Sequence, residues 1–100
     1  MKLGLKGKHV IVTGGGSNIG RAIVHAFAAE GSDISIAELA PSQGEIVAGE
    51  VAAMDTGSRV NVIPTDVGDP EKVAAMIEAA IAEFGPVDVL VNNVGWTIDR

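Results

Sequence analysis

The sequence predicts an α/β fold in which a doubly wound parallel sheet of four strands is packed against three helices. Short apolar, β-branched runs alternate with longer segments of helical periodicity, and a cluster of glycines separates the first run from the first helical segment. Strands that alternate with helices are joined by crossovers, which give parallel strands buried on both faces. Because such crossovers are right-handed, we expect the strand order 3-2-1-4.

The first strand is predicted over His9–Thr13, a short run rich in β-branched residues. The first helix is predicted over Ile19–Glu30, followed by Gly31 as a natural helix stop. Its apolar face is expected to carry Ile19, Ile23, Ala26 and Phe27.

A second strand is predicted over Asp33–Glu38. The next helix is expected to begin with a capping box, in which Ser42 is the N-cap and Glu45 is the third helical residue. It should end near Gly57. Its buried face is predicted to carry Val47, Val51 and Met54.

Arg59–Ile63 is the third predicted strand. The third helix has the strongest signal in the chain, because Asp69 fits an N-cap and Pro70 a first helical residue. Its apolar face contains Val73, Met76, Ile77, Ala80, Ile81 and Phe84. Gly85 should end this helix, and Val87–Val91 is the fourth predicted strand.

Composition limits the classes of function. The chain has 100 residues, of which 47% are hydrophobic and 20% charged, and no linker or repeat interrupts it. We therefore treat residues 1–100 as one domain or part of one. The net charge of −6 disfavours a nucleic-acid partner, and no apolar run has membrane-spanning length. The absence of cysteine is compatible with a cytoplasmic location. The two histidines, His9 and His25, are expected on the surface or on a helix face. They are too few and too far apart in the sequence for a zinc site.

The stretch VTGGGSNIGR follows the first predicted strand, and three interpretations of its glycines compete. The glycines can form a loop whose N–H groups bind a diphosphate together with the helix starting near Ile19, a tight structural turn, or a flexible linker. A mononucleotide P-loop does not fit, because Arg21 and Ala22 stand where lysine and a hydroxyl are required. The strict dinucleotide pattern G-x-G-x-x-G also fails, at Ile19.

Polar residues follow the other three predicted strands. Glu38 can accept both hydroxyls of an adenosine ribose or be an exposed acid at a strand end. Asp66 can accept from an adenine amino group or cap a turn, and Asn92 and Asn93 can bind backbone and cofactor or form turns. All of these positions lie at the carboxyl ends of strands, where open α/β sheets bind ligands.

With these residues identified, the chain resembles the N-terminal, cofactor-binding portion of the short-chain dehydrogenase/reductase family. The family loop T-G-x-x-x-G-x-G matches Thr13–Gly20, except that Asn18 replaces the middle glycine. Asparagine tolerates left-handed backbone angles, so this departure is mild. The family's N-N-A-G appears as Asn92–Gly95 with Val94 in place of alanine, and its Asp-Val pair appears as Asp66–Val67.

This resemblance implies a Rossmann-type NAD(P)-binding domain that forms the N-terminal part of a longer single domain. It implies hydride transfer between NAD(H) and a small-molecule secondary alcohol or carbonyl compound. The stretch NNVGWTIDR faintly resembles members that act on hydroxyacyl thioesters. The full-length protein is expected to be a homo-oligomer, a tetramer or a dimer. The implied cofactor-binding residues are Gly14, Gly16, Ser17, Asn18, Ile19, Gly20, Glu38, Asp66, Val67, Asn92, Val94 and Gly95.

The family's catalytic serine and Tyr-x-x-x-Lys pair have no counterpart here, since the sequence contains no tyrosine. We therefore expect these 100 residues alone to be inactive, with no catalytic residue among them. A non-catalytic NAD-binding module is the alternative interpretation, and the missing tyrosine favours it for this exact chain.

Charge predicts the choice of cofactor. Glu38 would repel a 2′-phosphate, and Gly16, Ser17 and Leu39 offer no positive charge in compensation. The sequence therefore predicts NAD in preference to NADP.

The predicted strand order leaves Val87–Val91 at an edge, with N–H and C=O groups unpaired. We therefore expect residues 1–100 alone to be marginally stable or to self-associate. Thermal melts at several protein concentrations would test this, and a sharp melt independent of concentration would contradict it.

Overall fold

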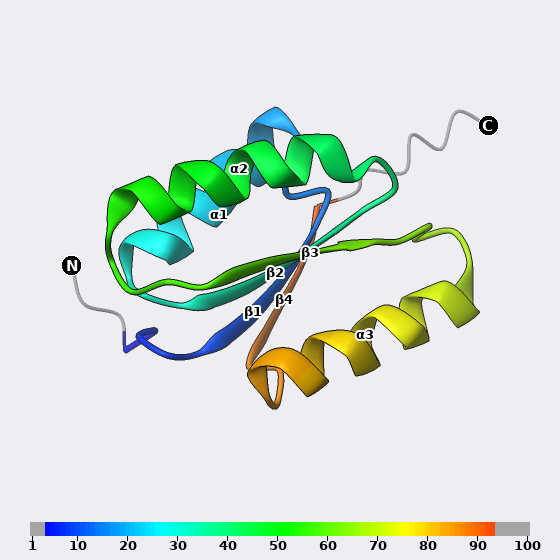
Figure 1. Ribbon diagram of the computed structural model, residues 1–100. Coiled ribbons are helices and arrows are strands. Elements are labelled where there is room, and N and C mark those ends of the chain that lie inside the picture. The colour runs from blue at the N-terminus through cyan, green and yellow to red at the C-terminus, as the bar shows by residue number, and fades with distance from the viewer. Residues whose placement is uncertain (1–3, 94–100) are drawn as a thin grey trace.

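The computed structural model describes residues 4–93 of the chain, which form four strands and three helices. In chain order these are β1 (His9–Thr13), α1 (Asn18–Ala29), β2 (Asp33–Glu38), α2 (Pro41–Met54), β3 (Val60–Pro64), α3 (Pro70–Phe84) and β4 (Val89–Asn92). Every strand pair is parallel and the order is β3-β2-β1-β4 (Figure 1). The predicted fold class and strand order are confirmed.

Helices pack on both faces of the sheet, α1 and α2 on one and α3 on the other (Figure 1). Every residue of β1 and β2 is consequently buried. The core beneath α1 and α2 contains Val10, Val12, Val24, Ala28, Ile34, Ile36, Val47 and Val51. The smaller core beneath α3 contains Ile11, Ala37, Met76 and Ala80.

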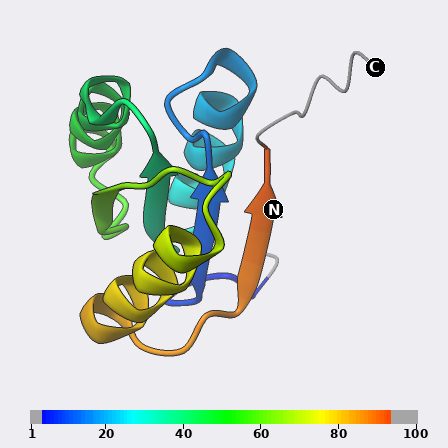
Figure 2. The same ribbon diagram turned by 90° about the vertical axis from the view of Figure 1, so that its right-hand side faces the viewer.

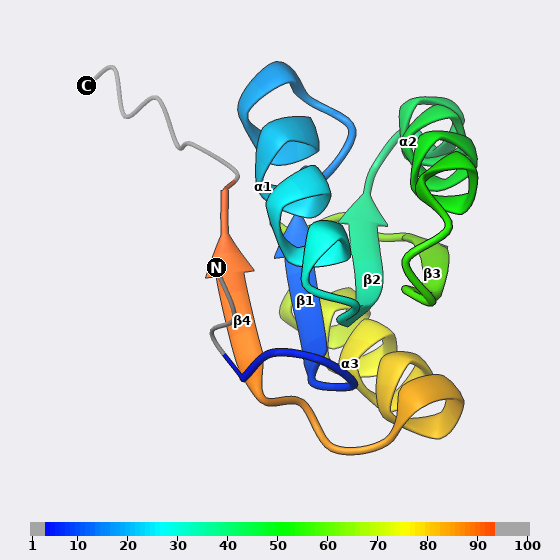
Figure 3. The same ribbon diagram turned by 90° about the vertical axis from the view of Figure 1, so that its left-hand side faces the viewer.

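β4 forms one edge of the sheet, with β1 as its pairing partner (Figures 2 and 3). Leu90 pairs with Ile11, yet its side chain is 58% exposed, because α3 does not extend over β4 (Figure 2). Among the helices of residues 4–93, none combines the length and the apolar character needed to cross a membrane.

The buried face of α1 differs from the prediction. Its fully buried residues are Gly20, Val24 and Ala28, whereas Ile19 is 69% exposed. Ile23 and Phe27 are only partly buried, and Ala26 is exposed. The helix lies close to the sheet, so small residues occupy the line of contact and larger apolar residues flank it.

The start of α2 also differs, because Pro41 begins the helix and Ala40, which makes no side-chain cap bond, is its N-cap. The predicted Ser42–Glu45 capping box is therefore wrong. Proline has a backbone angle suited to the first helical position, and this starts the helix before Ser42. The helix ends at Met54, where Asp55 adopts a left-handed conformation, so the chain turns before Gly57.

Other boundaries agree closely with the sequence. β1 and β2 have the predicted limits, while β3 starts one residue later than predicted and β4 two residues later. Asp69 caps α3 by accepting a hydrogen bond from the Glu71 N–H at 3.0 Å, and Pro70 opens the helix as expected.

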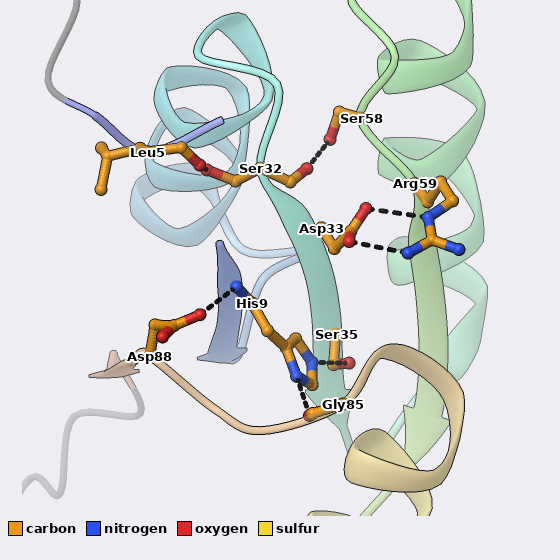
Figure 4. Close-up of polar contacts among 9 residues, drawn as sticks. All are labelled: Leu5, His9, Ser32, Asp33, Ser35, Ser58, Arg59, Gly85 and Asp88. Atoms are coloured by element: carbon orange, nitrogen blue, oxygen red, sulfur yellow. Dashed lines mark hydrogen bonds and ion pairs between the residues drawn. The ribbon is translucent and has the colours of Figure 1, made fainter. Parts of the chain in front are cut away.

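A buried polar network ties the amino end of the sheet together (Figure 4). His9 is buried, with Nδ1 2.9 Å from the Gly85 carbonyl oxygen and Nε2 2.8 Å from Ser35 Oγ. A carbonyl only accepts, so in the neutral ring Nδ1 carries the hydrogen and the Ser35 hydroxyl donates to Nε2. The expectation of a surface position for His9 is wrong, because these two partners satisfy the ring inside the protein.

An ion pair lies beside this network. Arg59 donates two hydrogen bonds to Asp33, at 2.9 and 2.8 Å (Figure 4). The guanidinium carbon of Arg59 also lies 4.8 Å from the centre of the Phe84 ring. The Asp33 side chain is only 10% exposed. Hydrogen bonding from Arg59 lowers the pKa of Asp33 below its usual value.

We predict that Arg59→Met destabilises the fold by roughly 1–3 kcal/mol at pH 7, because a nearly buried carboxylate loses its donors. The lowered pKa of Asp33 means that the pair stabilises the folded state above about pH 4 and that this stabilisation is lost as the pH falls through the folded-state pKa. Urea unfolding from pH 3 to pH 7 should show the two proteins converging in acid.

Lys72→Met, which removes an exposed cation of α3, is the matched control and should change stability little. A stability difference between Arg59→Met and the original protein that stays constant across this pH range would contradict the assignment.

Candidate functional site

The carboxyl ends of the strands define the candidate site. Figure 3 shows β1, β2 and β4 pointing toward the end of the sheet where the loop into α1 lies. This loop, Gly14–Ser17, connects β1 to α1. Since all pairs are parallel, the residues that follow β2, β3 and β4 emerge at the same edge as this loop.

The glycine loop is a tight, internally hydrogen-bonded turn. Gly14 adopts a positive φ of 66°, which favours glycine, and its N–H donates to the Ala37 carbonyl at 2.8 Å. Ser17 is the N-cap of α1, because its hydroxyl accepts from the Gly20 N–H at 3.1 Å. That hydroxyl also donates to the Gly14 carbonyl at 2.8 Å. These bonds fix the loop and exclude a flexible linker.

The start of α1 approaches the loop very closely at Gly20. A β-carbon there would overlap the Gly14 carbonyl oxygen. The first turn of a helix leaves N–H groups without helical acceptors, here those of Asn18 and Ile19, and carries the positive end of the helix dipole. The side chain of Ile19 is exposed. This arrangement suits an anionic group such as a diphosphate.

Glu38, the last residue of β2, contacts the glycine loop. Its Oε1 accepts a hydrogen bond from the Gly16 N–H. The residue is only 8% exposed, and its Oε2 has no hydrogen-bond partner within residues 4–93. A buried carboxylate oxygen without a donor is costly, so this atom marks a position that suits a ligand hydroxyl.

A cavity of about 540 Å³ joins these features. Its lining consists of Gly14, Gly16, Ser17, Asn18, Glu38, Leu39, Ala40 and Gln43. Ala40 and Gln43, at the start of α2, were not among the predicted site residues. The sequence signal for them is a helix that opens directly after an acid at a strand end. The glycine cradle and the free Glu38 oxygen fit a dinucleotide with its diphosphate and ribose hydroxyls.

Other predicted residues lie at a second, smaller cavity of about 160 Å³ on the α3 side. Its lining consists of Thr13, Val67, Val73, Met76, Ile77, Leu90 and Asn92. Val67 and Asn92 thus line a different cavity from that of the glycine loop and Glu38. Asp66 is exposed, and its Oδ1 accepts from the Gly68 N–H at 2.9 Å, as in a capped turn.

The end of β4 is tied to the glycine loop by Asn93, which was noted in the sequence but not placed among the site residues. Its Nδ2 donates to Ser17 Oγ at 3.0 Å and to the Gly14 carbonyl at 3.3 Å. Thr13 Oγ1 accepts from the Asn93 N–H at 2.9 Å and lies 3.0 Å from Asn92 Oδ1. Val94 and Gly95 lie outside the described residues.

Comparison with known proteins agrees with this geometry. The sequence profile described as short chain dehydrogenase matches residues 8–100. A short chain dehydrogenase/reductase of Aspergillus oryzae, astE, is 45% identical over 92 residues, which cover 92% of this chain and 35% of that protein.

Solved structures also match. L-sorbose reductase from Gluconobacter frateurii, complexed with NADPH and L-sorbose, superposes with a TM-score of 0.88 at 36% identity, covering 96% of this chain and 36% of that one. An NAD⁺-bound xylitol dehydrogenase gives a TM-score of 0.85 at 30% identity, covering 92% and 35%. The chain therefore spans little more than a third of the length of these relatives.

We predict that Gly20→Ala destabilises the fold by roughly 1–3 kcal/mol, because the added carbon forces the loop away from α1. Gly49→Ala is the control, since Gly49 lies within α2 with open space around its α-carbon. It should stabilise by ~0.5–1 kcal/mol through helix propensity. Chemical denaturation measures both changes, and equal effects would refute the close approach.

Proposed function

Because this chain belongs to the short-chain dehydrogenase family, we propose that it forms the dinucleotide-binding half of an oxidoreductase that transfers hydride between NAD(H) and a small secondary alcohol or carbonyl compound. The observation that carries this proposal is the buried Oε2 of Glu38, which has no hydrogen-bond partner within residues 4–93 and belongs to a residue that lines the same cavity as the glycine loop. When bound, the nicotinamide would supply or accept the hydride.

In this proposal, different residues bind different parts of the dinucleotide. The N–H groups of Asn18 and Ile19 bind the diphosphate, while Gly14 and Gly16 leave room for it. Ser17 holds the loop in shape through its bonds to Gly14 and Gly20.

The remaining residues serve the two ends of the ligand. Glu38 accepts the adenosine ribose hydroxyls, and Asp66 with Val67 borders the adenine. Asn92, Val94 and Gly95 follow the fourth strand and border the nicotinamide half. The tie between Asn93 and the loop supports this last assignment, because it brings the end of β4 against the diphosphate-binding turn.

The preference for NAD rests on this chain's own charges. The larger cavity has no lysine or arginine in its lining, whereas Glu38 places a carboxylate there. A 2′-phosphate would meet this carboxylate without a compensating cation. Structural relatives occur with either NAD⁺ or NADPH, so membership of the family does not decide the choice.

We propose a small alcohol or ketone as the substrate of the whole protein. The sorbose and xylitol enzymes among the structural relatives make polyols and ketoses the first compounds to assay, with hydroxyacyl thioesters next. We also propose a homo-oligomer and a cytoplasmic location for the whole protein.

In the family that this chain belongs to, proton transfer is expected from a serine and a Tyr-x-x-x-Lys pair, and tyrosine is absent from these 100 residues. These residues should therefore bind NAD without turnover. Turnover should require the longer protein, and a longer protein that binds NAD but oxidises none of these compounds would favour a binding module.

Calorimetric titration should show NAD binding at least about tenfold more tightly than NADP, a difference of ~1.4 kcal/mol. Glu38→Ala combined with Leu39→Arg should reverse this preference, because the variant exchanges a carboxylate for a guanidinium beside the ribose. Glu78→Ala removes an acid from the exposed surface of α3 and should leave the preference unchanged. If the double variant keeps the original preference, the assignment of Glu38 to the ribose is wrong.

A further inference from the structure

The two carboxylate oxygens of Glu38 have different surroundings. Oε1 accepts from the Gly16 N–H, while Oε2 is buried and has no partner in the described part of the chain. A carboxylate can accept several hydrogen bonds at once. One oxygen is therefore already committed to the protein, and the other is left for a donor.

Backbone closes around this carboxylate from two directions. A β-carbon at Gly16 would overlap Oε1 and would lie 2.8 Å from Oε2. A β-carbon at Gly44, in the first turns of α2, would lie 3.3 Å from Oε2 and 2.8 Å from Val62 Cγ1. The glycine loop and α2 both lack side chains where they meet Glu38, and this allows the carboxylate to reach the loop backbone.

The acceptor for the Gly16 N–H differs from the acceptors for the Gly14 and Ser17 N–H groups. The Gly14 N–H donates to the backbone of β2, and the Ser17 N–H donates to the Gly14 carbonyl within the turn. Gly16 lies between these two residues, and its N–H is held by a side chain from β2. The position of this peptide therefore depends on which residue stands at position 38.

We propose that Glu38 is a positioning residue for the diphosphate loop as well as the ribose acceptor, with Oε1 holding Gly16 and Oε2 receiving the ribose hydroxyl. This inference rests on the proposed binding of NAD. If Glu38 only bound the ribose, residue 38 would not affect the binding of a diphosphate that has no ribose. If Glu38 also positions the loop, the binding of such a diphosphate depends on residue 38.

Two neutral variants of equal length separate the roles. Glu38→Gln keeps an oxygen that can accept from Gly16, whereas Glu38→Met keeps the length but has only a weakly accepting sulfur. Both remove the negative charge, so electrostatic repulsion of an anion changes equally.

Inorganic pyrophosphate is the probe, titrated calorimetrically into the purified protein. We expect Glu38→Gln to bind it about three- to tenfold more tightly than Glu38→Met. Equal affinities would overturn the proposal.

Amide hydrogen exchange at Gly16, followed by NMR without any ligand, provides an independent readout. Exchange should stay slow in the original protein and in Glu38→Gln, and should accelerate severalfold in Glu38→Met. Leu39→Ala is the control, because Leu39 lines the same cavity and is exposed, so Gly16 exchange should not change. Unchanged exchange in Glu38→Met would also refute the proposal.

The outcomes distinguish this inference from the proposed function. If the original protein binds neither NAD nor pyrophosphate, the function fails, while Gly16 exchange still tests the role of Glu38. If it binds both and the two variants behave alike, only the positioning role fails. Glu38→Ala replaces Glu38→Met if the methionine variant does not fold.

Discussion

All strands of this sheet run in the same direction, and the candidate site depends on that constraint. A parallel sheet delivers the residues that follow each strand to one edge. The glycine loop thus contacts both Glu38, through Gly16, and Asn93, through Gly14, although these residues are widely spaced along the chain. Parallel pairing also requires helical crossovers, which bury β1 and β2 on both faces and give the glycine loop a rigid base.

The polar groups described above at the two ends of the sheet differ in whether they have hydrogen-bond partners within the protein. At the amino end, the His9 ring and the Asp33 carboxylate have their donors and acceptors matched by partners within the protein. At the carboxyl end, Oε2 of Glu38 has no hydrogen-bond partner within residues 4–93, and the first N–H groups of α1 have no acceptor within the helix.

Sequence periodicity predicted the elements and their order, because the spacing of apolar residues differs between strands and helices. It did not predict which residues of a helix are buried or where a helix begins, because these depend on packing and on local backbone preference. Helical spacing placed Ile19 on the apolar face of α1, but close contact with the sheet selects Gly20 and Ala28. The capping box at Ser42 was locally sound, yet Pro41 starts α2 earlier. Motif spacing located the glycine loop and Glu38, whereas the roles of Gln43 and Asn93 depend on contacts between distant segments.

The central position of β1 has a consequence for biosynthesis. This strand is made first, but its pairing with β4 joins residues such as Thr13 and Asn92, which are 79 positions apart. At the usual rate of translation, β1 keeps one edge open for roughly four to sixteen seconds before β4 is synthesised. A nascent chain in this interval presents an apolar strand edge to its surroundings. Until β4 is made, this edge is open to pairing with other chains or with a chaperone.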